Sequence, residues 1–120
     1  DKATILSVIS SFLEEQGHSV TTALNGLSGF EKTHKSDFDL FIIDHLMPVM
    51  DGLQLIKRLK QNEKTSNTPI VFMSTQDLKS IAYLKKSNVV DALISKPIDY
   101  SQLAELINDY SPENTLNLSL

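Results

Sequence analysis

Three short apolar runs constrain the fold of this chain more than any other feature. They cover residues 40–43, 70–73 and 92–95, and are followed by Asp44, Ser74 and Lys96. Uninterrupted runs of this length are typical of strands that are buried on both faces. The segments between them have apolar residues at helical spacing, and strands that alternate with helices indicate parallel βαβ units. The sequence therefore predicts an α/β protein with a doubly wound parallel sheet.

Helix and turn signals place the remaining elements. Apolar residues at helical spacing predict helices at residues 4–16, 27–34, 52–59, 77–86 and 101–110. Gly17 is expected to end the first helix, and Asp51 is expected to be the N-cap of the third helix rather than a ligand. Residues 19–23 have the pattern of a short strand, more polar than the others, as an edge strand would be.

Composition narrows the class of protein. A length of 120 residues predicts one domain with a real hydrophobic core, and the absence of cysteine excludes disulfides and thiolate metal sites. The net charge of −4 argues against direct nucleic-acid binding, so the cluster Lys57, Arg58 and Lys60 is interpreted as a solvated helix face. No apolar run approaches the length of a membrane span, and we expect no membrane association and a cytoplasmic location.

The polar residues after the three runs form the candidate site. The carboxyl ends of parallel strands meet at one edge of a sheet, where open α/β folds bind their ligands. We therefore expect the carboxylate of Asp44, the hydroxyl of Ser74 and the ammonium of Lys96 to converge there. Each residue alone would be uninformative, since an Asp after a strand is often a loop former. Together they suit the uptake of a phosphoryl group, because a carboxylate can attack phosphorus while an ammonium neutralises charge.

At these residues the chain closely resembles the receiver domain of bacterial response regulators. That family has a phosphoacceptor Asp followed by MPxMDG, then a Ser or Thr after the next strand and Lys-Pro after the strand beyond. Here Asp44 is followed by HLMPVMDG, and Lys96 is followed by Pro97. The spacings from Asp44 to Ser74 and to Lys96 match the family pattern without a gap. The resemblance covers nearly the whole chain and implies a flavodoxin-like receiver fold.

The start of the chain departs from the family pattern. The family begins with a buried strand and an acidic pair, whereas here Asp1 comes directly before the first helix. We therefore expect a receiver domain at residues 1–111 that lacks its first strand, with a linker or tail at residues 112–120. A less favoured alternative is that the tail supplies a strand, because residues 115–120 alternate with a period of two.

The resemblance implies a phosphoacceptor in two-component signal transduction, not an enzyme that acts on other substrates. Asp44 would take a phosphoryl group from a histidine kinase or a histidine phosphotransfer protein. Lys96 would pair with Asp44 at rest, and Ser74 would donate a hydrogen bond to the phosphoryl group. Mg²⁺ is the implied cofactor, with Asp1, Asp44 and the backbone carbonyl of Leu46 as ligands. The resemblance also allows an output domain or target protein and a phosphorylation-dependent dimer.

Two departures from the family leave a second interpretation open. Family members usually carry an aromatic residue three positions before the Lys, whose ring rotates with the Ser or Thr, and this chain has Leu93 there. The family's Gly-Ala is replaced by Val89-Val90. Both changes indicate that signal output uses a different surface or mechanism from that usual in the family. The alternative function is a pseudo-receiver, a protein-binding module that is not phosphorylated. Leu93 and the absence of a counterpart for the first acid favour it, whereas the intact Asp44, Ser74 and Lys96 weigh against it.

A phosphatase of the haloacid-dehalogenase type is the rival enzyme class. Such an enzyme needs a second Asp two residues after its nucleophile to protonate the leaving group, and that position is Leu46 here. His45 is expected to point to the opposite face from Asp44, as a structural or surface side chain. His18 and His34 are isolated in the sequence. A histidine metal site is therefore not predicted.

Overall fold

The strands form one parallel sheet in the computed structural model, which describes residues 2–45, 49–75, 78–110 and 116–119. In chain order they are β1 (Ser19–Thr22), β2 (Leu40–Asp44), β3 (Ile70–Ser74), β4 (Ala92–Ser95) and β5 (Leu116–Ser119). Their order across the sheet is β1-β5-β2-β3-β4, and each neighbouring pair is parallel. The predicted doubly wound parallel sheet is confirmed.

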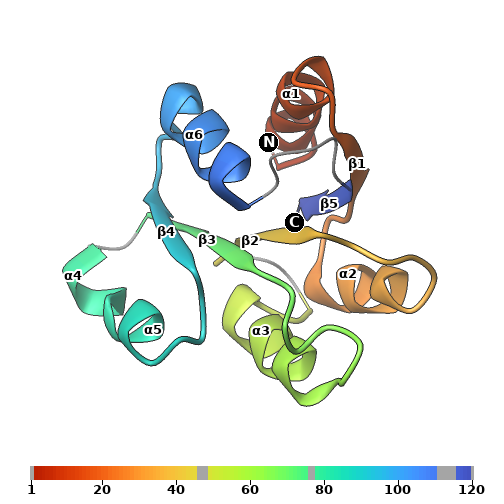
Figure 1. Cartoon of the computed structure of the whole chain (residues 1–120), viewed down its shortest axis with the longest axis vertical. Coiled ribbons are helices and arrows are strands. Elements are labelled where there is room, and N and C mark those ends of the chain that lie inside the picture. Colours follow the sequence, from red (N-terminus) through yellow and green to blue (C-terminus); the bar gives the residue numbers. More distant parts are fainter. Residues whose placement is uncertain (1, 46–48, 76–77, 111–115, 120) are drawn as a thin grey trace.

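Helices cover both faces of this sheet (Figure 1). One face carries α1 (Lys2–Glu15) and α6 (Tyr100–Tyr110), and the other carries α2 (Gly26–Thr33), α3 (Gly52–Gln61), α4 (Leu78–Ile81) and α5 (Tyr83–Lys86). No helix among the described residues is long and apolar enough to cross a membrane.

Strand β2 contributes side chains to both hydrophobic cores. Successive strand residues point to opposite faces. Leu40 and Ile42 accordingly pack in the core formed with α1 and α6, whereas Phe41 and Ile43 pack in the core formed with α3, α4 and α5. All five residues of β2 are buried. The two-sided cover explains why the run at residues 40–43 is apolar without interruption.

Gly17 ends the first helix, as predicted. Its N–H donates to the Glu14 carbonyl at 3.0 Å, and the His18 N–H donates to the Leu13 carbonyl at 3.2 Å. This is the Schellman pattern of hydrogen bonds, which requires a left-handed residue at the position after the cap. Gly17 has φ 96°, which glycine adopts without steric cost.

Asp51 is the N-cap of α3, again as predicted. Its Oδ1 accepts from the Gln54 N–H at 2.9 Å, and the Gln54 Oε1 accepts from the Asp51 N–H at 3.0 Å. These reciprocal bonds form a capping box, which satisfies two helix-end donors. The cap therefore fixes the start of α3, which follows shortly after Asp44 in the sequence.

We expect Asp51→Ala to lower the free energy of unfolding by about 1 kcal/mol, because the cap is lost. Asp51→Ser should retain most of the stability, since a serine hydroxyl can also accept from the third helical N–H. Urea unfolding of the three proteins measures the difference. Equal stability of Asp51→Ala and the native chain would contradict the capping role.

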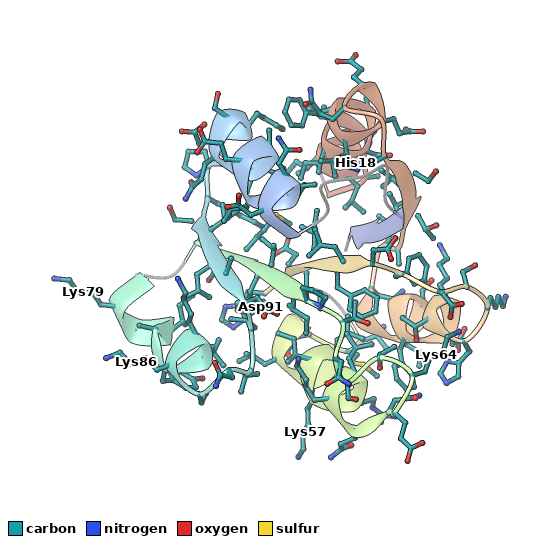
Figure 2. All side chains as sticks on the ribbon, viewed as in Figure 1. His18, Lys57, Lys64, Lys79, Lys86 and Asp91 are labelled. Atoms are coloured by element: carbon teal, nitrogen blue, oxygen red, sulfur yellow. The ribbon has the colours of Figure 1, made fainter. Side chains whose placement is uncertain are left out.

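Asp91 ties the beginnings of β3 and β4 together. Its N–H donates to the Ile70 carbonyl at 2.9 Å, and its Oδ2 accepts from the Ile70 N–H at 2.8 Å. Figure 2 labels this residue beside the two strands. The register that follows pairs Ser74 with Ser95, at the carboxyl ends of β3 and β4. Asp91 therefore helps to align Ser74 with the strand that leads into Lys96.

The lysine side chains labelled on α3, α4 and α5 extend outward from the molecule (Figure 2). They are Lys57, Lys79 and Lys86. In the predicted basic cluster, Lys57 and Arg58 are exposed, and the Arg58 guanidinium lies 5.9 Å from the centre of the Phe30 ring. The interpretation of this cluster as a solvated helix face is therefore confirmed for these two residues.

Two segments differ from the sequence predictions. The helix predicted at residues 77–86 is divided into α4 and α5 by Ala82, which has φ −59° and ψ −24° and remains in the helical region. Residues 116–119 form β5, which pairs with β1 on one side and β2 on the other. This corrects the expectation that residues 112–120 form only a linker or tail. The pairing of β5 with β1 and β2 bears out the less favoured alternative, in which the tail supplies a strand.

Candidate functional site

Asp44 and Lys96 form an ion pair at the carboxyl edge of the sheet. Asp44 is the last residue of β2, and Lys96 follows β4, on the far side of β3. The Lys96 Nζ lies 2.6 Å from the Asp44 Oδ2, with side-chain exposures of 23% for Lys96 and 11% for Asp44. Because both partners are charged, this contact is stronger than a hydrogen bond between neutral groups. The structure therefore brings together the predicted carboxylate and ammonium.

The backbone around Lys96 fixes the direction of its side chain. The Lys96 N–H donates to the Ser74 carbonyl at 2.9 Å, which continues the ladder between β3 and β4 by one residue. The Lys96–Pro97 peptide bond is cis. The hydrogen bond holds Lys96 at the end of β3 while its side chain reaches across to β2.

Ser74 lies at the same edge but contacts another residue. It is buried, and its Oγ lies 3.0 Å from the Nδ1 of His45. The two residues share the sheet face of the core that contains Phe41, Ile43 and Phe72, because strand side chains alternate. The contacts described at this edge therefore join Asp44 to Lys96 and Ser74 to His45.

His45 is the site residue whose contacts the sequence did not predict. Its expected position on the opposite face from Asp44 is correct, but it is buried rather than exposed, which rules out the surface alternative. Its ring centre lies 5.1 Å from that of Phe72. The available signal was the matching alternation of Phe41, Ile43 and His45 with Phe72 and Ser74 on the next strand.

Helix α3 packs closely against the end of β2. The Gly52 N–H donates to the His45 carbonyl at 3.0 Å. A Cβ at Gly52 would lie 2.3 Å from the carbonyl oxygen of Asp44 and 2.9 Å from the Phe72 Cε1. Because such an approach is too close for any side chain, glycine is required where α3 meets the end of β2.

The predicted metal ligands are only partly described. Asp1 and Leu46 lie outside the described residues, and Asp44 is the one predicted ligand whose position is given. Among residues 2–45, 49–75, 78–110 and 116–119, no group of three or more His, Cys, Asp or Glu side chains could hold a metal ion. Asp51 caps α3, as expected.

Leu93 lies in β4, at the position where members of the family usually have an aromatic residue. It is half-buried and packs against the core that contains Phe72 and Ile43. In the register of the sheet it pairs with Phe72. Val89 packs against the same core, and Val90 is buried within it. Aliphatic side chains therefore occupy the three positions at which the chain departs from the family pattern.

The sequence matches the family model of the response regulator receiver domain over residues 1–108. With the parallel sheet and the Asp–Lys pair at its edge, this match establishes that the chain belongs to the response regulator receiver domain family. The family membership that was expected from the residues after the three apolar runs is therefore confirmed.

Curated relatives come from several kinds of organism. The probable transcriptional regulator ycf29 of Porphyra purpurea is 33% identical over 115 residues, which is 95% of this chain and 55% of that protein. Protein PilH of Pseudomonas aeruginosa is 28% identical over 108 residues, which is 90% of this chain and 89% of PilH. The chain spans about half the length of the two ycf29 relatives. Algal as well as bacterial proteins are therefore similar to it.

Solved structures have the same fold. The receiver domain of the Francisella response regulator 1452 superimposes with a TM-score of 0.83 at 26% identity, covering 92% of this chain and 89% of that one. The receiver domain of sensor histidine kinase PA1611 from Pseudomonas aeruginosa superimposes with a TM-score of 0.82 at 18% identity, covering 94% of this chain and 93% of that one. That structure has a magnesium ion coordinated in its active site cleft. The flavodoxin-like receiver fold is thereby confirmed.

Proposed function

We propose that this domain accepts a phosphoryl group on Asp44 from a phosphohistidine donor, either a histidine kinase or a histidine phosphotransfer protein, and relays the signal by a change of conformation. The observation that carries this proposal is the 2.6 Å contact between the Lys96 Nζ and the Asp44 Oδ2. A carboxylate that meets a phosphoryl group faces like-charge repulsion, and an ammonium already in place reduces it. Membership of the receiver family supports the same role.

The chemistry follows from the groups at the edge of the sheet. A carboxylate oxygen of Asp44 attacks phosphorus, and the bond from phosphorus to the donor nitrogen breaks with its electron pair leaving on the donor. The product is an acyl phosphate, in which a phosphoryl group with a charge of about −1.5 to −2 takes the place of the single negative charge of the carboxylate. Lys96 can then turn from the carboxylate to a phosphoryl oxygen. Ser74, one residue from the strand pairing partner of Asp44, supplies a hydroxyl donor.

Mg²⁺ fits the donor chemistry of this site. It prefers hard oxygen ligands and is commonly bound through one or two carboxylates, with substrate phosphate and water completing its shell. Asp44 provides such a carboxylate, and we propose Asp1 and the Leu46 carbonyl as further ligands. The ion would supply positive charge to the phosphoryl oxygens.

The proposal predicts that phosphorylation requires a divalent cation. Incubation with acetyl phosphate and Mg²⁺ should give an acyl phosphate resonance in the ³¹P NMR spectrum of the protein. The resonance should be absent when a chelator is present from the start, and should return when excess Mg²⁺ is added. Failure of the resonance under all conditions would favour the pseudo-receiver, a binding module with the receiver fold and no phosphate chemistry.

The signalling role also predicts that this chain is not a turnover phosphatase. Efficient hydrolysis of the acyl phosphate would need an acid and base beside the nucleophile, and residue 46 is a leucine. A slow loss of phosphate suits a signal carrier. An output domain, a target protein or a second phosphorylated copy would then read the changed surface.

A further inference from the structure

The hydrogen bond between His45 and Ser74 joins the phosphoacceptor strand to the strand that carries the hydroxyl. Both side chains are buried, with exposed fractions of 8% and 1%. The Ser74 Oγ lies 3.0 Å from the His45 Nδ1, which is a normal hydrogen-bond length. A hydrogen bond of this kind contributes favourably to the free energy of a buried hydroxyl.

His45 is fixed in place by contacts on several sides. Its N–H donates to the Met73 carbonyl at 2.9 Å, and its own carbonyl accepts from the Gly52 N–H at 3.0 Å. Its ring lies against that of Phe72, at a centroid distance of 5.1 Å. The imidazole therefore has little freedom to follow Ser74 if the hydroxyl turns away.

The side chains of Ser74 and Asp44 lie on opposite faces of the sheet. Ser74 follows Phe72 in the alternation of β3, on the face covered by α3, whereas Asp44 follows Leu40 and Ile42 in the alternation of β2. A serine hydroxyl occupies one of three staggered positions. Because His45 lies on the same face as Ser74 and Asp44 lies on the other, we expect the rotamer that places Oγ beside His45 to differ from the one that would aim it at a phosphoryl group on Asp44.

We infer that His45 is a positioning residue that holds the Ser74 hydroxyl in its resting orientation, so that phosphoryl uptake at Asp44 requires Ser74 to exchange His45 for a phosphoryl oxygen. This inference rests on the proposed function of Asp44. The resting hydrogen bond stabilises one of two arrangements, and any ligand that recruits Ser74 must overcome it. His45 thereby sets how readily the site responds.

The test compares the affinity for beryllofluoride, a phosphoryl mimic, in the presence of Mg²⁺, measured by ¹⁹F NMR. His45→Phe keeps an aromatic ring against Phe72 but removes the nitrogen, and it should bind the mimic about 2- to 10-fold more tightly, the factor set by one ordinary hydrogen bond. His45→Asn keeps a polar atom near the position of Nδ1 and should bind like the native chain. His45→Val serves as the apolar variant if the phenylalanine variant does not fold.

A second pair of proteins separates positioning from general packing. In a Ser74→Ala background, His45→Phe should leave the affinity for the mimic unchanged, because the residue acts through the hydroxyl. Unchanged or weaker affinity of His45→Phe in the native background would overturn the inference, as would the same gain persisting without Ser74. If the native chain binds no beryllofluoride at all, the proposed function fails as well, so the two failures are distinguishable.

Discussion

Replacing Asp44 with asparagine should abolish phosphorylation of this domain. The asparagine side chain would preserve the size and shape of the native one at the end of β2 and could still accept a hydrogen bond from Lys96, but an amide is a far weaker nucleophile than a carboxylate. Intact-mass spectrometry after treatment with acetyl phosphate and Mg²⁺ should show one added phosphoryl group on the native chain and none on Asp44→Asn.

The matched control is Asp37→Asn, which makes the same chemical change at a surface carboxylate. The side chain of Asp37 is 96% exposed and lies 3.6 Å from the Lys64 Nζ. This variant should be phosphorylated at the native rate. An undiminished mass shift in Asp44→Asn would assign the acceptor to another residue, and a loss of the shift in Asp37→Asn as well would indicate a general effect of removing acidic charge.

The second large effect is expected at Lys96. Its Nζ is the positive charge seen beside the Asp44 carboxylate, so Lys96→Ala removes a group poised to neutralise the incoming phosphoryl charge. Loss of one such preorganised group lowers rates by about 10² to 10³, and we expect the initial rate of phosphorylation by acetyl phosphate to fall by that order. Time courses of intact mass at fixed Mg²⁺ measure it.

Lys64→Ala provides the corresponding control for lysine. Lys64 forms an ion pair with Asp37 at the surface, and an exposed pair of this kind contributes little. Its removal should leave the rate of phosphorylation unchanged. A Lys96→Ala variant that is phosphorylated as fast as Lys64→Ala would show that the 2.6 Å contact with Asp44 has no part in the reaction.

The residues at the carboxyl edge of the sheet could be predicted because each one directly follows a recognisable apolar run in the sequence. An apolar run buried on both faces marks a strand, and the residue after the run must lie at the carboxyl end of that strand. Asp44, Ser74 and Lys96 could therefore be placed at one edge before any contact was known. The ends of α1 and α3 were predictable for a similar reason, since Gly17 and Asp51 act through bonds to residues within about one turn.

The remaining features depend on partners that are distant in the sequence. The tail strand β5 has four residues, and its place between β1 and β2 comes from backbone pairing with segments in the first half of the chain. The bond from His45 to Ser74 spans 29 residues and depends on the register of β2 against β3. Alternation alone gave the face of His45 but not its neighbour. Alternation indicates a strand at residues 115–120 and the face of His45, but it does not identify the partner strand or the partner residue.

The most direct test of the account is to locate the phosphoryl group on the chain. After phosphorylation by acetyl phosphate with Mg²⁺, borohydride reduction converts an aspartyl phosphate into homoserine, which peptide mass spectrometry can identify at a single position. We expect homoserine at Asp44 and at no other acidic residue, and its absence from samples treated with chelator. Reduction at a different carboxylate, or a phosphoryl group found on Ser74 or a histidine, would contradict the central claim that Asp44 is the phosphoacceptor.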